Sequence, residues 1–173
     1  MKAGVRRLAL ATAVCAAAAT AQGCTVPTAG VTGISVTEEG QPLGVLVVCH
    51  DHMDVAVLYT DGDKPDDLSK TVGRWSRTDP VTGFTTWPLD TGGDGWTVER
   101  SSSGRLAPDK TYTLFGGTHD NSWSTASVDF TVGQLAALVP GEVRYYTGER
   151  DGDADVYRTT SMADFRSVAC RGM

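Results

Sequence analysis

The sequence predicts a mainly β protein, an antiparallel β-sandwich followed by a small α/β extension at the C-terminus. Short runs of β-branched and aromatic residues recur along the chain, and polar turn segments rich in Asp, Asn and Gly separate them. Two helix-start signals appear only late in the chain. The predicted strands lie at 34–36, 43–49, 54–60, 74–76, 83–87, 96–99, 112–116 and 126–130.

The predicted strand 43–49 is apolar at consecutive positions, so we expect it in the middle of the sandwich with both faces buried. The strand 54–60 is followed by Asp61-Gly62-Asp63, residues typical of a turn. Turn residues of this kind between short strands favour antiparallel neighbours.

The C-terminal extension is expected to hold two helices and a hairpin. Thr131 and Gln134 form a Thr-x-x-Gln capping box before the apolar run 135–138. Ser161 starts a second helix with Phe165, Val168 and Ala169 on one side. The segments 143–146 and 155–158 predict the hairpin between the helices.

The first 23 residues have the pattern of a secretory signal. Lys2, Arg6 and Arg7 precede a charge-free run at 8–21, and small residues follow. As a helix, these 14 residues would rise only about 21 Å, short of the roughly 30 Å hydrocarbon core of a bilayer. The segment therefore predicts a cleaved signal rather than a permanent membrane span.

The signal ends in Ala21-Gln22-Gly23-Cys24, which resembles the cleavage site of bacterial lipoproteins. The resemblance implies cleavage before Cys24 and a diacylglyceryl group on its thiol, so the membrane is the expected partner. Gly23 fits the family pattern, whereas Ala21 replaces a Leu and Gln22 a small residue. The alternative is an ordinary signal peptide that leaves Cys24 as a free thiol on a secreted protein.

The predicted organisation is a signal peptide at 1–23, a flexible tether at 24–32, a sandwich at 33–131 and the extension at 132–173. The tether is inferred from small, polar residues with Pro and Gly among them.

Of the four cysteines, Cys15 leaves with the signal and Cys24 is the expected acylation site. Cys49 and Cys170 are the two that remain, in an oxidising compartment, which predicts a disulfide between them. The bond would tie the extension to an early strand.

The chain is acidic, with a net charge of −6, and loss of the basic signal makes the remainder more so. An acidic surface without a basic, aromatic-rich patch argues against nucleic-acid binding. Gly-x-Ser-x-Gly, His-Glu-x-x-His and Gly-rich phosphate loops are absent from the sequence. We therefore expect a non-catalytic binding or structural protein that needs no cofactor.

The stretch Leu106-Ala107-Pro108-Asp109-Lys110-Thr111-Tyr112 resembles the Leu-x-Pro-x-x-x-Tyr motif of fibronectin type III and related immunoglobulin-like domains. The resemblance implies an immunoglobulin-like sandwich in which the Tyr112 hydroxyl bonds to upstream backbone. The signal ending in Gly23-Cys24, the strand Leu46-Val47-Val48-Cys49 and the segment Ala163-Asp164-Phe165-Arg166 before Cys170 resemble those of small actinobacterial, streptomycete-like lipoproteins of unassigned function. This second resemblance implies a cell-envelope location and no particular chemistry.

Two groups of residues are candidate binding sites. His50 and His52 share a face in an extended segment, and with His119 they could bind copper or zinc. The alternative for the two earlier histidines is an exposed polar turn. Trp87 and Trp123, each flanked by turn-forming residues, are candidates for stacking on a glycan such as peptidoglycan or for anchoring a protein partner.

Overall fold

The computed structural model describes residues 25–60, 70–101, 106–171 and 173. The signal peptide, Cys24 and the turn at Asp61-Gly62-Asp63 lie outside the described residues. Strands account for 59% of the structure and helices for 9%, which confirms the mainly β class.

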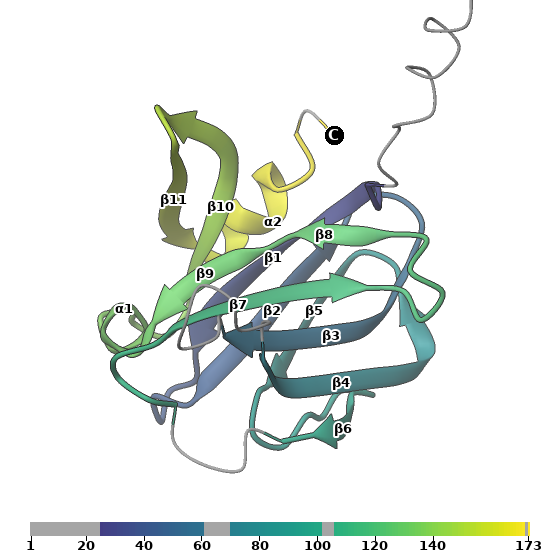
Figure 1. The fold of residues 1–173 in the computed structure, drawn as a ribbon, viewed down its shortest axis with the longest axis horizontal. Coiled ribbons are helices and arrows are strands. Elements are labelled where there is room, and N and C mark those ends of the chain that lie inside the picture. Colours follow the sequence, from purple (N-terminus) through teal and green to yellow (C-terminus); the bar gives the residue numbers. More distant parts are fainter. Residues whose placement is uncertain (1–24, 61–69, 102–105, 172) are drawn as a thin grey trace, which may run out of the picture.

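The described residues form the strands and helices labelled in Figure 1. The elements are β1 (Thr28–Val36), β2 (Pro42–Val48), β3 (Met53–Thr60), β4 (Lys70–Val81), β5 (Phe84–Pro88), β6 (Thr97–Arg100), β7 (Thr111–Gly117), β8 (Ser124–Ala126), β9 (Val128–Thr131), α1 (Val132–Ala136), β10 (Glu142–Asp151), β11 (Ala154–Ser161) and α2 (Met162–Val168).

All of these strands belong to one curled, open sheet. Its main path runs β11-β10-β1-β8-β7-β3-β4-β6, while β2 joins β1 to β5 and β9 pairs with β7. The short strand β8 makes the sheet continuous, because it pairs parallel with β1 and antiparallel with β7. The structure thus has a single curled sheet where the sequence predicted two separate ones.

Curling brings β1, β2 and β5 opposite β3, β4 and β7 across the major core (Figure 1). Trp75 of β4 meets Trp87 of β5 there, with ring centroids 6.1 Å apart. Alternation places the buried side chains of β7 on this side, as period-2 burial in a strand requires. The fully buried aliphatic side chains of this core include Ile34, Leu46, Leu58, Leu114 and Val128.

A close approach between β2 and β5 depends on glycine. Gly44 pairs with Trp87 across the two strands, and a Cβ on Gly44 would lie 2.5 Å from the indole ring. The indole therefore occupies the space above the Gly44 backbone. A residue with a side chain at position 44 would fill that space itself.

The C-terminal extension covers the outer face of β1 and β2. Val143, Tyr145 and Phe165 pack there against Val45 and Val47, forming a second, minor core. The neighbouring residues Leu46 and Val48 face the major core, so both faces of β2 are buried as predicted. The sheet is thus sandwiched locally between the major core and α2.

The helix-start signals are confirmed by the caps of both helices. Thr131 accepts a hydrogen bond from the Gln134 backbone N–H, and the Gln134 side chain accepts one from the Thr131 N–H. Ser161 caps α2 by accepting from the Asp164 N–H. On α2, Phe165 is fully buried and meets Tyr145 at 5.0 Å between ring centroids.

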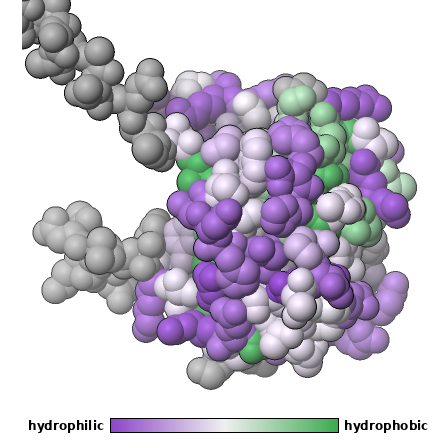
Figure 2. All heavy atoms as spheres, turned by 90° about the vertical axis from the view of Figure 1, so that its right-hand side faces the viewer, coloured by the Kyte–Doolittle hydropathy of each residue, from purple (hydrophilic) through white to green (hydrophobic). Residues whose placement is uncertain are grey.

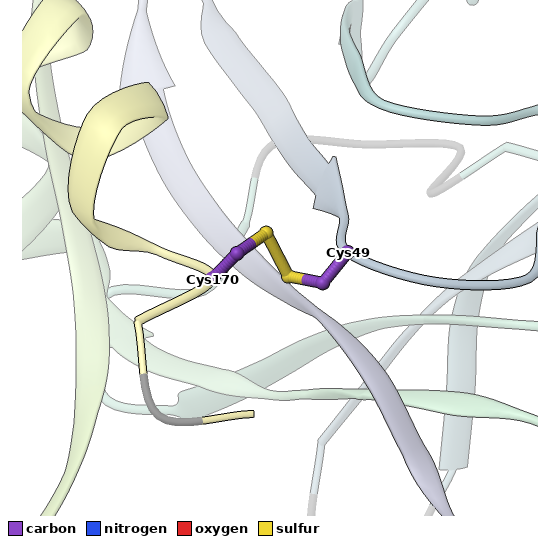
Figure 3. The surroundings of a disulfide bond; sticks show 2 residues. All are labelled: Cys49 and Cys170. Carbon is purple, nitrogen blue, oxygen red and sulfur yellow. A yellow bond between two sulfur atoms is a disulfide. The ribbon is translucent and has the colours of Figure 1, made fainter.

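The disulfide joins Cys49, just after β2, to Cys170, just after α2, across 121 positions of sequence (Figure 3). It fastens the end of α2 to the end of the strand that α2 covers. The predicted pairing of these two cysteines is present in the structure.

The predicted tether at 24–32 is too long. Residues 28–32 belong to β1, with Ala29, Val31 and Thr32 buried. The Thr32 hydroxyl meets that of Thr125 at 2.6 Å, and the Gly116 N–H donates to both oxygens. Gly30 fits between these neighbours, because a Cβ on it would collide with the Val47 carbonyl oxygen of β2.

Candidate functional site

Four of the predicted binding residues, His50, His52, His119 and Trp123, lie at one end of the sheet, in the loop 49–52 and the turn 118–123. We call this the loop end. It is the end where β1 begins: Thr28 pairs with Ser124, and the Cys49 N–H donates to the Ala29 carbonyl. The His50 N–H donates to the same carbonyl at 3.3 Å. The loop end is therefore built on paired strand ends.

The turn 118–123 is fixed by hydrogen bonds to two side chains. The Thr118 hydroxyl accepts from the backbone N–H groups of Ser122 and Trp123 at 2.9 and 3.1 Å. Asp120 accepts from the Ser122 hydroxyl at 2.7 Å and from its N–H at 3.0 Å. Hydrogen bonds from Ser122 and Thr118 lower the pKa of Asp120 to about 2, because they stabilise the ionised carboxylate.

The two halves of the loop end touch through an aromatic contact. The His50 imidazole meets the Trp123 indole edge-on, with centroids 5.8 Å apart and planes at 81°. The Asp54 carboxylate also accepts from the His119 N–H at 2.8 Å. These contacts connect residues more than 60 positions apart, and sequence reasoning missed both of them.

The three histidines do not form a common ligand set among the described residues. His52 Nδ1 lies 2.7 Å from Asp51 Oδ1, whereas His50 contacts Trp123 and His119 is tied to Asp54 by its backbone. Across 25–60, 70–101, 106–171 and 173, no group of three or more His, Cys, Asp or Glu residues could hold a metal ion.

Of the two candidate tryptophans, Trp87 is misassigned as a surface residue. It is 0% exposed and lies between Trp75 and Trp96, with its ring 4.8 Å from that of Trp96. Turn residues around it suggested exposure, but Gly44 opposite makes space for the ring inside the core. Trp123 is half-buried: it packs against the major core and is partly exposed at the loop end.

Two hollows lie outside the loop 49–52 and the turn 118–123. A cavity of about 480 Å³ at the opposite end is lined mainly by apolar residues, among them Leu58, Leu89, Leu106 and Leu135. A groove of about 840 Å³ lies between the β10–β11 hairpin and α2, with Tyr146, Arg158 and Arg171 in its lining. No histidine lines either hollow.

A polar cluster joins the sheet to the hairpin, and nothing in the sequence pattern indicated it. Asp129 accepts from the Thr113 hydroxyl at 2.7 Å, and its carbonyl accepts from Arg144 Nε at 3.2 Å. The Arg144 guanidinium lies 4.6 Å from the centre of the Tyr157 ring. Burial raises the pKa of Tyr157 and lowers that of Arg144, which fits a packed, structural junction.

In the described part of the chain, α1 has five residues and α2 seven, so neither helix could span a bilayer. Comparison with known proteins finds no matching protein family, no similar curated protein and no similar solved structure.

Proposed function

We propose that this chain is a lipid-anchored, extracytoplasmic protein of the cell envelope with a non-catalytic binding or structural role. The proposed anchor is a diacylated Cys24, through which the protein binds the membrane. If Cys24 is not acylated, the same protein is secreted.

The disulfide between Cys49 and Cys170 carries this proposal. Disulfides of this structural kind persist in oxidising compartments and are rare in the cytosol, where thiols are kept reduced. Together with the signal-like N-terminus, the bond supports export before or during folding.

We also propose that the curled sheet is of the immunoglobulin-like type. Its support is the pairing of β1 with β2 and of β2 with β5 on one side, and of β4, β3, β7 and β9 on the other. A second support is the Tyr112 hydroxyl, which accepts a hydrogen bond from the upstream Ala107 N–H at 2.8 Å, as the motif at 106–112 leads one to expect.

Replacing the acylated thiol tests the anchor. We expect Cys24→Ser to move the protein from the membrane fraction to the medium, since two acyl chains hold a protein on a bilayer whereas a signal cut without lipidation does not. The measurement is the distribution of the protein between membrane and medium in a bacterium that processes lipoproteins.

Thr25→Ser serves as the matched control and should leave the protein in the membrane fraction. Mass spectrometry of the wild-type N-terminus should show a diacylglyceryl modification on residue 24. An unmodified Cys24, or a Cys24→Ser variant that stays membrane-bound, would contradict the proposal.

A further inference from the structure

The structure sets the length of chain between the proposed acylation site and the folded domain. The Pro27 carbonyl accepts a hydrogen bond from the Ser124 N–H at 3.0 Å, and Thr28 begins β1. Only Thr25 and Val26 separate Cys24 from this fixed point. Fully extended, the three Cα–Cα steps from Cys24 to Pro27 span about 11 Å.

Such a short connection cannot let the domain turn freely above a bilayer. The strand β1 alone has nine residues and is about 30 Å long. A domain of that size, fastened within about 11 Å of an embedded lipid, must keep the start of β1 near the membrane.

From this geometry we infer that the loop end is a membrane-contact surface that lies against lipid headgroups. The inference rests on the proposed acylation of Cys24. The loop 49–52 and the turn 118–123 surround the start of β1 and therefore face the bilayer. The cavity at the opposite end, lined by Leu58 and Leu135, faces away from it.

The chemistry of the loop end fits headgroups rather than acyl chains. Its exposed residues are polar or charged, among them His50, Asp51, His119 and Asp120. Figure 2 views the side of the molecule where β7 runs into β8, and hydrophilic residues cover most of it. The half-buried Trp123 adds an indole edge, and indole rings favour the interface between water and lipid.

Tryptophan quenching can measure which end meets the bilayer. The full, acylated protein is reconstituted in phosphatidylcholine vesicles, some of whose lipids carry a nitroxide on the headgroup. The Trp123 emission is obtained by subtracting the spectrum of Trp123→Phe, which retains the three buried tryptophans Trp75, Trp87 and Trp96. We expect this Trp123 emission to be strongly quenched by the nitroxide lipid.

The control places a tryptophan at the far end. Val139 is 54% exposed and follows α1, so Val139→Trp in the Trp123→Phe background adds an indole there without disturbing the core. We expect its quenching to be several-fold weaker than that of Trp123. Equal quenching at both positions would refute the orientation.

A longer connection between the anchor and the domain gives a second test, in which the same Trp123 emission is measured. Insertion of about twenty Gly/Ser residues between Val26 and Pro27, with a root-mean-square span of roughly 25 Å, should relieve most of the quenching. Unchanged quenching would also refute the inference, because the short connection would then not be its cause.

Flotation with the vesicles separates the two proposals. A protein that fails to float with them lacks the anchor, and both the proposed function and the orientation fall. A protein that floats but shows no preference between Trp123 and Val139→Trp keeps its anchor and loses only the orientation.

Discussion

At the scale of single residues, the packing of the major core depends on a glycine as much as on the large side chains around it. Gly44 carries no Cβ, and the Trp87 indole fills the space above it. Three indole N–H groups, on Trp75, Trp87 and Trp96, are buried without a hydrogen-bond partner in the part of the chain described. Because those groups stabilise nothing by hydrogen bonding, the cluster depends on close ring contact.

We predict that Gly44→Ala destabilises the protein by about 1–3 kcal/mol, since the new methyl group overlaps the Trp87 ring and forces the core to shift. The free energy of unfolding in urea measures this. Gly133→Ala in α1 is the matched control: its Cβ would have 3.8 Å to the nearest atom, so we expect a gain of roughly 0.5–1 kcal/mol. A neutral Gly44→Ala would show that the ring can move aside.

The Asp120 carboxylate gives a prediction for low pH. Its pKa is lowered from 3.8 to about 2 in the folded turn, so folding favours the ionised form. The contribution of Asp120 to the turn is therefore present above its unfolded pKa and is lost as the pH falls through the folded pKa near 2.

The Ser122 amide, which donates to Asp120, reports this titration by NMR. Its chemical shift should inflect near pH 2 in the wild type. The inflection should disappear in Asp120→Asn, while an inflection in the wild type near 3.8 would show that the hydrogen bonds to the carboxylate do not persist in solution.

At the scale of elements, α2 is held by one buried aromatic side chain and one covalent bond. The helix has seven residues, too few to be stable alone, so packing of Phe165 and the bond from Cys170 must keep it on the sheet. Phe165 fills the minor core beside Tyr145, and Arg166 lies 4.3 Å from the Phe84 ring of β5.

We predict that the double variant Cys49→Ala/Cys170→Ala loses about 2–5 kcal/mol of stability, because the bond closes a long loop in the unfolded chain. The midpoint of thermal unfolding should fall by roughly 5–15 °C. Adding a reductant should lower the wild-type midpoint to a similar value and leave that of the double variant unchanged. A wild-type midpoint insensitive to a reductant that demonstrably breaks the bond would contradict this account.

At the scale of the whole molecule, the fold has two ends of different character. The loop end holds the start of β1, the loop 49–52 and the turn 118–123, whereas the far end holds α1 and the apolar cavity. The disulfide lies beside the loop end, so the C-terminus is fastened near the place where β1 begins (Figures 1 and 3). An anchor at Cys24 would thus hold both ends of the chain near the bilayer.

Local sequence patterns were enough to predict the mainly β class, the caps at Thr131 and Ser161 and the pairing of the two late cysteines. Each of these depends on neighbouring residues or on a count of thiols, so no knowledge of distant contacts is needed. The anchor at Cys24 has the same origin and stays a prediction.

Only the tertiary structure decided where β1 begins, which tryptophan reaches the surface and which residues meet at the loop end. Residues 28–32 have the composition of a linker, yet pairing with β2 and β8 makes them a buried strand. Trp87 is buried because Gly44 lies opposite it. Trp123 meets His50 because the end of β2 and the start of β8, which are far apart in the sequence, both lie beside the start of β1. Such outcomes depend on strand register, which local composition does not encode.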